Sequence, residues 1–514
     1  MNDYDVIVIG AGNGGLVAAL TAVNDSKKVL LLESQNGPGA FATSFVKGRF
    51  EFENSLYQLS SYGTADNSGK LKKVFDELGI SSKINFVSIP EAFRVIQIGD
   101  EEIPRKDYTM PFEIKKFIEQ MEKYVPDSTA SLTLFFELAL ECKEALNYID
   151  ECEGNPSLEV IKTKYENFMR VSTYSVSKVF DTLGIPLEAQ EILNTYWLYF
   201  CSTETEMSFV QYAALLYDFI DLKIQIPLSK SYDISLTLAS EFVNRGGELR
   251  YSSVVSKILV NDGEVNGVKL NDGTIFYAKH VIANVSPHII YGKLVDPAEV
   301  PRRALKNCNQ REFGGTGFSI YLGLNRSPEE LGIENYSYYI YHTLDTDLEL
   351  EKMKKITNTS MIAFCLNKAI PDCSPKGTTL LTLNTYFFDE VFEKYLNANE
   401  YFDMKEEIAS NLINAFEETT GICIKNYIEE IEISTPLTFA RHSNYLLTFS
   451  YGYKLNSNDN FLSRIMNVNN EVYIKGLRFC GGFADGGIGF TETYLSGYRV
   501  AKLTLNDMVG ELNG

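Results

Sequence analysis

Two segments with the same pattern stand far apart in this chain, and they constrain its fold more than any other feature. Residues 3–22 read DYDVIVIGAGNGGLVAALTA, and residues 478–503 read RFCGGFADGGIGFTETYLSGYRVAKL. In each segment a short apolar strand runs into clustered glycines, and a helical pattern follows. The question is which fold needs two such units, and for which ligand.

The first unit matches a known dinucleotide-binding pattern. Residues 5–9, Asp-Val-Ile-Val-Ile, are predicted to form a buried strand. Gly10, Gly12 and Gly15 follow it with the spacing G-x-G-x-x-G. Gly10 permits a tight turn, Gly12 lets a pyrophosphate approach the backbone, and Gly15 allows close packing of helix on strand. The helix that follows offers free N–H groups and a partial positive charge to the phosphates.

An acidic residue stands where this pattern requires one. The second predicted strand, KKVLLLE, ends at Glu33, about twenty residues further on, where a carboxylate binds an adenosine ribose hydroxyl. An acid at this position disfavours a 2′-phosphate and so argues against NADP. A glycine-rich turn with no ligand is the alternative interpretation. The combination of strand, glycines, helix and acid favours a dinucleotide.

The segments after Glu33 favour FAD over NAD. In an NAD enzyme the third strand usually follows soon after the ribose acid, whereas residues 34–45, SQNGPGAFATSF, form a loop of small residues that suits the longer FAD. Residues 234–286 then predict a helix that ends at Gly246-Gly247, strands with Asp-Gly turns, and a buried strand HVIAN. This ordered set of blocks is more specific than the glycine pattern alone.

From end to end, these blocks resemble the phytoene desaturase and carotenoid isomerase family of FAD-dependent oxidoreductases, within the amine oxidase-like superfamily. Residues 246–258, GGELRYSSVVSKI, resemble the family segment in which a valine backbone contacts the adenine, and Val255 takes that place. Residues 280–287, HVIANVSP, resemble its return strand, which puts Asn284 near the cofactor. Residues 310–324 resemble the strand that opens the second section of the family's substrate domain.

The resemblance implies an α/β fold, in which a Rossmann-type FAD-binding domain of the glutathione-reductase-like type carries an inserted α+β substrate domain. Both ends of the chain then return to one sheet and hold one FAD. The FAD-binding domain is expected to comprise residues 1–85, 228–300 and 431–514. The substrate domain is expected to comprise residues 86–227, its helical part, and 301–430, its mixed-sheet part.

The resemblance also implies a set of FAD-binding residues. Gly481 and Gly482 would pass the ribityl phosphate, and residues 487–490 would reach the pyrimidine edge of the isoalloxazine. The helix that starts there would stabilise negative charge on a reduced flavin. The full set is Gly10, Gly12, Asn13, Gly14, Gly15, Glu33, Ser34, Gly39, Ala40, Thr43, Val255, Asn284, Gly481, Gly482, Gly487, Ile488, Gly489 and Phe490. A structural helix after a glycine turn is the alternative interpretation of the last unit.

Several positions depart from the family pattern. Residues 39–41, Gly-Ala-Phe, replace paired glycines followed by a basic residue, and residues 50–55, FEFENS, lack the usual Asp-x-Gly. Residues 227–233, PLSKSYD, lack the paired glycines that commonly precede the middle helix, and the last loop carries Ala-Asp at 484–485 without the usual prolines. FAD binding survives these changes, but the carotenoid substrate is not carried over.

The two inserted segments are predicted to bind the substrate. The first is rich in helical patterns and contains the aromatic stretch 194–220, while the second is predicted to be a mixed sheet with helices. With 31 Tyr and 32 Phe the chain can line a long apolar tunnel that ends at the flavin, although most of these side chains simply fill the core. Residues 111–125 are predicted to form a solvated lid helix, with docking on a lipid surface as the alternative.

Flavin chemistry asks little of side chains, because the flavin N5 accepts or returns a hydride and the protein supplies position and electrostatics. Glu492 and Asp485 follow the last glycine loop and are the weak candidates for a catalytic acid or base. The dipole of a helix also favours an acid in its first turn, which explains Glu492 equally well. Residues 314–317, Gly-Gly-Thr-Gly, lack Rossmann spacing, so no resident NAD(P)H site is predicted. Electrons would pass to or from a quinone, oxygen or a carrier.

Four functions fit this pattern. The first is an oxidoreductase that desaturates or saturates carbon–carbon bonds of an apolar, polyene or lipid-like substrate. The second is a redox-neutral double-bond isomerase that uses reduced flavin transiently. A lipid-binding or escort protein without turnover is the third, although the intact glycines at the flavin end argue against it. An amine oxidase, which needs an aromatic cage beside the flavin, is the fourth.

Composition bears on partners and location. The net charge of −21 disfavours nucleic acid, and eight cysteines without a CxxC pair indicate reduced thiols rather than a zinc or dithiol motif. Four scattered histidines give no support to a metal site or a Ser-His-Asp triad. The sequence shows no signal peptide and no apolar run near the ~20 residues of a membrane span. We therefore expect a cytoplasmic protein that is at most peripheral at a membrane surface.

Overall fold

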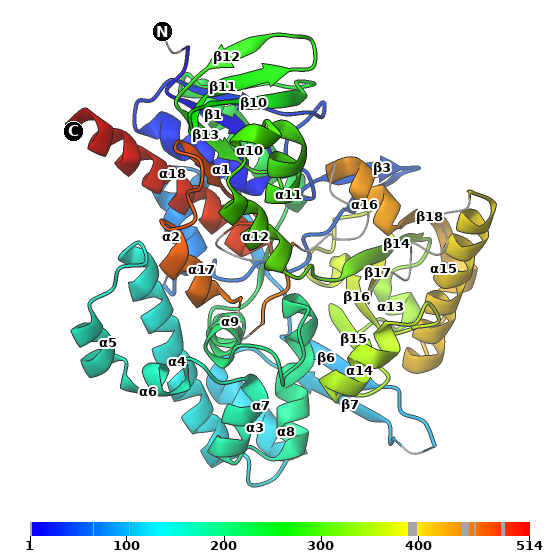
Figure 1. Ribbon diagram of the computed structural model, residues 1–514. Coiled ribbons are helices and arrows are strands. Elements are labelled where there is room, and N and C mark those ends of the chain that lie inside the picture. Colours follow the sequence, from blue (N-terminus) through cyan, green and yellow to red (C-terminus); the bar gives the residue numbers. More distant parts are fainter. Residues whose placement is uncertain are drawn as a thin grey trace.

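The computed structural model describes residues 3–64, 66–101, 103–388, 398–443, 452–456, 459–484 and 489–513. Figure 1 shows three groups of elements: a sheet with helices near both ends of the chain, a bundle of helices, and a second sheet flanked by a long helix. The first group contains the blocks that the sequence assigns to FAD. The other two groups contain the inserted segments.

The first group is built on a five-stranded parallel sheet. Its strands, in spatial order, are β19 (Leu477–Phe479), β13 (His280–Ala283), β1 (Val6–Ile9), β2 (Val29–Leu32) and β9 (Glu248–Arg250). Val6 lies opposite Val29 on one side and His280 on the other. The three central strands are buried along their whole length, as expected for parallel strands that are covered on both faces.

Helices cover one face of this sheet. They are α1 (Asn13–Asn24), α10 (Lys230–Asn244) and α18 (Phe490–Asn513). Helix α1 packs against both of the others. Alternate residues of β1 point to this face, where Val8 joins Leu16, Ile234 and Leu495 in one apolar cluster. The predicted strand–glycine–helix units at the two ends of the sequence thus lie side by side.

A three-stranded antiparallel sheet covers the opposite face. It consists of β10 (Val255–Asn261), β11 (Glu264–Leu270) and β12 (Ile275–Tyr277). Asp262 and Gly263 turn between the first two strands with φ angles of +51° and +76°. The two Asp-Gly turns expected from the sequence are therefore hairpins.

The second sheet has seven strands. In spatial order they are β18 (Ile428–Ser434), β14 (Thr316–Leu324), β17 (Thr379–Phe387), β16 (Met361–Cys365), β15 (Ser337–Tyr341), β6 (Phe93–Gln97) and β7 (Lys106–Met110). β15 and β6 pair in parallel, and the other pairs are antiparallel. β6 and β7 come from the first inserted segment, where the sequence indicated mainly helices. Their partner β15 lies far along the chain, so no local pattern shows this pairing.

The two faces of this mixed sheet have different neighbours. The long helix α15 (Ala398–Thr420) covers one face, where Leu412 and Phe416 pack with Ile320. The opposite face carries Tyr339 and Phe364 into the apolar core of the helical bundle. The cavity described below lies on this second face.

The helical bundle, at the lower left of Figure 1, comes from the first inserted segment. Its elements are α3 (Ile114–Tyr124), α4 (Thr129–Glu151), α5 (Leu158–Lys164), α6 (Glu166–Val171), α7 (Val176–Leu183), α8 (Leu187–Leu193), the 3₁₀ helix η2 (Asn194–Phe200) and α9 (Phe209–Asp221). Helix α3, the predicted lid helix, buries Phe117 and Met121 and packs against α4 and α9.

The remaining elements are short. They are β3 (Ser44–Lys47), β4 (Phe50–Glu53), α2 (Lys70–Glu77), η1 (Ser81–Lys83), β5 (Phe86–Ser88), β8 (Gln225–Pro227), α11 (Pro287–Ile289), η3 (Ile290–Leu294), η4 (Pro297–Glu299), α12 (Arg302–Gln310), α13 (Pro328–Leu331), α14 (Thr346–Met353), η5 (Leu366–Lys368), η7 (Lys425–Tyr427), α16 (Pro436–Ser443) and α17 (Phe461–Asn467). Strands β5 and β8 pair with each other where the first inserted segment leaves and returns. The expected boundary after residue 430, in contrast, falls inside β18.

Two further observations concern only the part of the chain that the structure describes. There, no helix is both long and apolar enough to cross a membrane. The same residues contain no group of His, Cys, Asp and Glu side chains that could hold a metal ion.

Candidate active site

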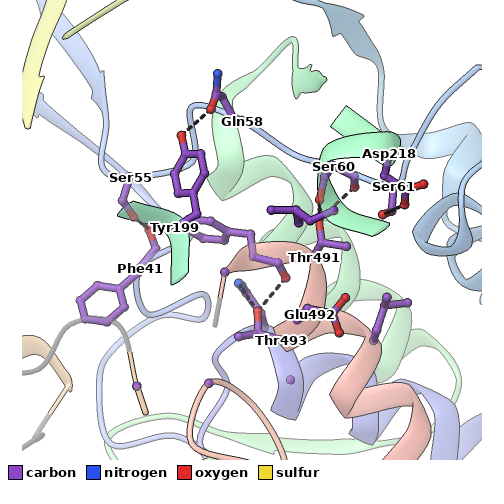
Figure 2. A pocket seen from close by; sticks show the side chains of 18 of the residues that line it. Phe41, Ser55, Gln58, Ser60, Ser61, Tyr199, Asp218, Thr491, Glu492 and Thr493 are labelled. Atoms are coloured by element: carbon purple, nitrogen blue, oxygen red, sulfur yellow. Dashed lines mark hydrogen bonds between the residues drawn. The ribbon is translucent and has the colours of Figure 1, made fainter. Parts of the chain in front are cut away.

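A cavity of about 510 Å³ lies where the parallel sheet, the helical bundle and the mixed sheet meet. We call its first part the glycine end, lined by Gly12, Asn13, Gly14, Gly39, Ala40, Asn284, Gly482 and Gly489. The second part, the aromatic end, is lined by Tyr57, Gln58, Tyr199, Phe200, Phe219, Phe364 and Tyr386. The third, the charged rim, is lined by Lys70, Lys73, Lys143, Glu151, Asp218 and Glu492. Figure 2 shows Tyr199, Asp218 and Glu492 around the cavity.

At the glycine end, the turn after β1 leaves no room for side chains. Gly10 has a φ angle of +92°, which favours glycine. A Cβ added at Gly15 would lie 1.9 Å from the carbonyl oxygen of Gly10. These two glycines therefore have the mechanical roles expected from the sequence, a tight turn and close packing of helix on strand. A Cβ at Gly12 would lie 2.7 Å from Nδ2 of Asn284, at the edge of the cavity.

The second glycine loop lies beside the first. The backbone N–H of Gly39 donates to the carbonyl oxygen of Ala11 at 2.8 Å, and Gly39 forms a bridge with Gly12. Gly39 and Ala40 have φ angles of +111° and +51°. Thr43, the last predicted residue of this loop, donates to the carbonyl oxygen of Ala40 at 3.4 Å. Both loops thus present backbone at the same end of the cavity.

The predicted ribose acid is held in place by backbone groups. Glu33 follows β2, is buried, and its Oε2 accepts from the N–H of Ala11 at 2.6 Å. Its Oε1 accepts from the N–H of Gln35 at 2.8 Å and from the hydroxyl of Ser34 at 3.1 Å. Val255 is buried at the start of β10 and is not among the residues that line the cavity. Glu33 and Ser34 meet the glycine turn without lining the cavity either, and Val255 follows residues 252–253, whose backbone N–H groups donate to the carbonyl oxygens of Gln35 and Glu33.

The last unit of the chain contacts the first directly. A Cβ at Gly497, on α18, would lie 2.2 Å from the carbonyl oxygen of Gly14, so the two helices touch through their backbones. Gly481 has a φ angle of +89°, and a Cβ there would lie 2.2 Å from Oδ1 of Asn284. Asn13 donates to the hydroxyl of Thr493 at 3.3 Å. The sequence therefore placed the two units correctly at one end of one sheet.

Not every predicted site residue can be placed. Asp485, Gly487 and Ile488 lie outside the described residues. Gly489 has a φ angle of +95° and lines the cavity together with Phe490, the first residue of α18. Glu492 also lines the cavity.

The residues at the glycine end fit a dinucleotide. Their Cβ positions at Gly12, Gly14 and Gly481 fall within 3 Å of neighbouring atoms, so only glycine keeps this end open. Oδ1 of Asn13 is buried and makes no hydrogen bond within the described residues. A backbone cradle at a helix start is the arrangement that binds a pyrophosphate. The cradle continues into the aromatic end, which gives room for a ring system.

The aromatic end joins residues of the two inserted segments, which the sequence predicted to bind the substrate, to Tyr57 and Gln58, which it did not single out. Tyr57 stacks on Phe364 of β16, with ring centroids 4.7 Å apart and planes 6° apart. Tyr199 comes from η2, within the aromatic stretch noted in the sequence, and Tyr386 comes from β17. Ser319 donates to Oδ1 of Asn384 at 2.7 Å on the strands beneath. This part of the cavity is therefore mainly apolar, with a few polar groups.

The charged rim joins helices of the first group to the helical bundle. Asp150 on α4 pairs with both Lys70 on α2 and Arg499 on α18. Burial, followed by the charge of Arg499, lowers the pKa of the Lys70 amine to about 8. Lys143 pairs with Asp218 at 2.5 Å. The pairs of Asp150 link the two parts of the molecule, and the Lys143–Asp218 pair joins α4 to α9 within the bundle.

The fold and the glycine end define a dinucleotide-binding protein of the α/β class. Residues 14–505 match the sequence model of the family described as flavin containing amine oxidoreductase, so the chain belongs to that family. It is 22% identical to an all-trans-retinol 13,14-reductase of Danio rerio over 463 residues, 85% of this chain and 75% of the relative. It is 25% identical to a chloroplastic prolycopene isomerase of an Oncidium hybrid cultivar over 456 residues, 85% of this chain and 73% of the relative.

Solved structures agree on the fold. An oxidoreductase from Methanosarcina mazei superposes with a TM-score of 0.63 at 16% identity, over 97% of this chain and 100% of that chain. A redesigned putrescine oxidase superposes with a TM-score of 0.65 at 14% identity, over 98% and 99% of the two chains. Because the chain belongs to the flavin containing amine oxidoreductase family, it is a flavoprotein with FAD as its cofactor, and an enzyme of the FAD-dependent oxidoreductase and isomerase class. When bound, the flavin supplies hydride transfer at N5.

Proposed function

We propose that this protein is an FAD-dependent oxidoreductase that desaturates or saturates a carbon–carbon bond in a long apolar substrate, a polyene or a lipid-like molecule. The observation that carries the proposal is the continuity of the glycine end with the aromatic end in one cavity. Aromatic and aliphatic walls remove an apolar chain from water, which stabilises its binding. Two relatives are named for retinol and prolycopene, both apolar polyenes.

In this proposal the glycine end holds the cofactor. The backbones of the two loops at Gly12 and Gly39 bind the pyrophosphate, and Glu33 binds the adenosine ribose. The start of α18, with Gly489 and Phe490, lies against the flavin and favours negative charge there. The remaining residues of the set given in the sequence analysis keep their expected roles. The division into an FAD-binding and a substrate-binding domain is part of the same proposal.

The other residues of the cavity position the substrate and exclude water. Tyr57 and Phe364 form a stacked pair that offers a flat apolar wall to a conjugated chain. For proton transfer we keep Glu492 as the candidate, because it lines the cavity in the first turn of α18 and acts electrostatically on Lys70. Asp485 keeps its place as the second candidate.

A redox-neutral isomerase is the second candidate function. It is favoured by the relatives named prolycopene isomerase. An isomerase uses the same cavity and the same apolar substrate class. It differs because the electrons or the proton exchanged between flavin and substrate are returned, so that no net oxidation or reduction occurs. Consumption of an external electron acceptor or donor separates the two functions.

The test begins with the visible spectrum of the purified protein and of its denatured supernatant, where flavin bands are expected. The protein is then incubated with all-trans-retinol, both oxidised and after anaerobic reduction, and the products are separated and weighed by mass spectrometry. A gain or loss of two hydrogens supports the oxidoreductase. An unchanged mass with a new retention time supports the isomerase. Flavin reduction by benzylamine or putrescine, with polyenes inert, overturns both in favour of an amine oxidase.

A further inference from the structure

A polar cluster interrupts the apolar wall of the aromatic end. It consists of Gln58, which follows β4, Tyr199 of η2 and Tyr339 of β15. The hydroxyls of both tyrosines donate to Oε1 of Gln58, that of Tyr339 at 2.8 Å. The two hydroxyl oxygens are 3.0 Å apart. Figure 2 shows the bond between Gln58 and Tyr199.

The cluster has more donors than it uses. The Gln58 amide carries two N–H donors and each tyrosine carries one O–H donor. Nε2 of Gln58 is buried and makes no hydrogen bond within the described part of the chain. Exchanging the amide oxygen and nitrogen would use one or both N–H groups but would release a tyrosine O–H. In either orientation the cluster keeps a buried donor unsatisfied, which is unfavourable unless a ligand or water accepts from it.

The residues that carry the spare donor, Gln58 and Tyr199, line the cavity, and a turn of the Gln58 amide would present its N–H groups there. Two residues beyond Gln58, the carbonyl oxygen of Ser60 accepts from the hydroxyl of Thr491 at 2.9 Å, at the start of α18. The cluster is therefore tied to the helix start that faces the proposed flavin position. Burial raises the pKa of Tyr199 well above its ordinary value, so its hydroxyl keeps its proton and remains a donor.

The charges around the cavity favour a neutral acceptor over a carboxylate. The cluster itself carries no cation. Of the lysines that line the cavity, Lys70 pairs with Asp150 and Lys143 pairs with Asp218, while Lys73 is exposed on the charged rim and not at the aromatic end. A carboxylate buried at the aromatic end would thus lack a partner of opposite charge, which makes its burial unfavourable.

We propose that Gln58 is a specificity-determining residue whose amide, supported by Tyr199, donates a hydrogen bond to a neutral oxygen of the substrate. The substrate is then an apolar chain that carries a hydroxyl or carbonyl group, and it is not a pure hydrocarbon. This inference rests on the proposed function, because it assumes an apolar substrate in this cavity. A site built around a buried donor rejects an analogue that lacks the acceptor, because the donor is then left unpaired.

The test measures binding, not turnover. FAD-loaded protein is titrated in the dark under nitrogen with all-trans-retinol and with axerophtene, the hydrocarbon in which hydrogen replaces the hydroxyl. Quenching of protein fluorescence gives the two dissociation constants. The variants are Gln58→Met, Tyr199→Phe and Gln211→Met. The last is a matched control, because Gln211 also lines the cavity but lies outside the cluster. Flavin content and thermal midpoint are recorded for each variant.

We expect the wild-type protein to bind retinol about tenfold more tightly than axerophtene, the size of one net hydrogen bond. Gln58→Met should bring this ratio close to one, and Tyr199→Phe should reduce it. Gln211→Met should leave it unchanged. If Gln58→Met does not hold FAD, the Tyr199→Phe result decides.

Four results overturn the inference. Equal binding of retinol and axerophtene by the wild-type protein contradicts the inference and leaves the proposed function unaffected. A ratio of dissociation constants that does not fall in Gln58→Met has the same meaning. A shift of the flavin bands in Gln58→Met with an unchanged ratio assigns the amide to the cofactor instead. Failure of both probes to bind contradicts the proposed function itself, and the inference falls with it.

Discussion

The glycine end and the aromatic end of the cavity recognise their ligands in different ways. At the glycine end, backbone atoms lie so close together that added Cβ atoms at Gly14, Gly15 and Gly497 would fall within 3 Å of them. At the aromatic end, side chains from separate segments, among them Tyr57, Tyr199 and Phe364, form the wall. The shape of the glycine end depends on the absence of side chains, and the shape of the aromatic end depends on the side chains that line it.

This difference explains how one fold serves several substrates. A backbone cradle admits few substitutions, because each added atom meets main chain that cannot move away. A side-chain wall can change residue by residue while the fold is kept. The relatives at 22–25% identity bear the names of a reductase and an isomerase, with different substrates. Four measurements test the difference between the glycine end and the aromatic end.

The largest effect is expected where the backbones of α1 and α18 touch. Gly497→Ala places a Cβ 2.2 Å from the carbonyl oxygen of Gly14, so the helices must separate. We expect a loss of about 3 kcal/mol in the free energy of unfolding, and loss of bound FAD. The control is Gly510→Ala on the same helix, where a Cβ meets nothing within 4 Å. For both variants, urea unfolding measures the free energy of unfolding and the flavin content of the purified protein measures bound FAD. Equal behaviour of the two variants would contradict close packing at this end.

At the aromatic end, a large change should spare the cofactor. Phe364→Ala removes the ring that stacks on Tyr57, and we expect a loss of about 2 kcal/mol in stability, less than for an enclosed phenylalanine because one side faces the cavity. FAD content should stay the same while retinol binding weakens. Phe318→Ala, on the face of the sheet that α15 covers, is the control and should leave retinol binding unchanged. Loss of FAD from Phe364→Ala would show that the two ends are not separable.

Asn284 has a side chain that lies among the glycines. Its amide lies against both Gly12 and Gly481, and its atoms are near the proposed pyrophosphate. Asn284→Ala should weaken FAD binding about tenfold by loss of one hydrogen bond. Asn284→Asp should weaken it further, because a carboxylate repels a phosphate. Titration of the apoprotein with FAD measures both, and Asn261→Ala in the exposed hairpin serves as the control. Tighter FAD binding by Asn284→Asp would contradict the proposed position of the phosphate beside residue 284.

The smallest effect concerns pH and belongs to the substrate side. Burial, followed by the nearby Asp345 and Asp347, raises the pKa of Glu204 to about 7. Between the ordinary carboxyl range and pH 7, the folded protein therefore binds more protons than the unfolded chain, and its stability falls as pH rises. Glu204→Gln cannot ionise. It should be about 1 kcal/mol more stable than the wild type at pH 8, a value discounted for the partial exposure of Glu204.

Urea unfolding at pH 4 and pH 8 checks this expectation. The stabilisation by Glu204→Gln should disappear at pH 4, where the wild-type carboxyl is also protonated in both states. A constant difference at both pH values would assign the effect of the substitution to packing.

The two ends also differ in how far the sequence alone could define them. The parallel sheet, the hairpins and the contact between the two terminal units followed from local patterns, because glycine spacing and strand runs are read within about twenty residues. The pairing of β6 with β15 did not follow from local patterns, because the two strands lie far apart in the sequence and neither sequence shows how the strands align. Gln58, Tyr199 and Tyr339 likewise come from three distant segments, and only the folded chain brings their polar atoms together.

The contact between α1 and α18 has a consequence for biosynthesis. Chains emerge from the ribosome with their earlier residues first, and domains fold as their segments become available. Helix α1 is then made long before residues 490–513, whose backbone closes the glycine end against it. The cofactor cradle is therefore completed only after all the segments between α1 and α18 have been translated. A truncated translation product that lacks α18 would leave both the glycine end and the cavity incomplete, because residues 489–493 line it, and we expect such a product not to retain FAD.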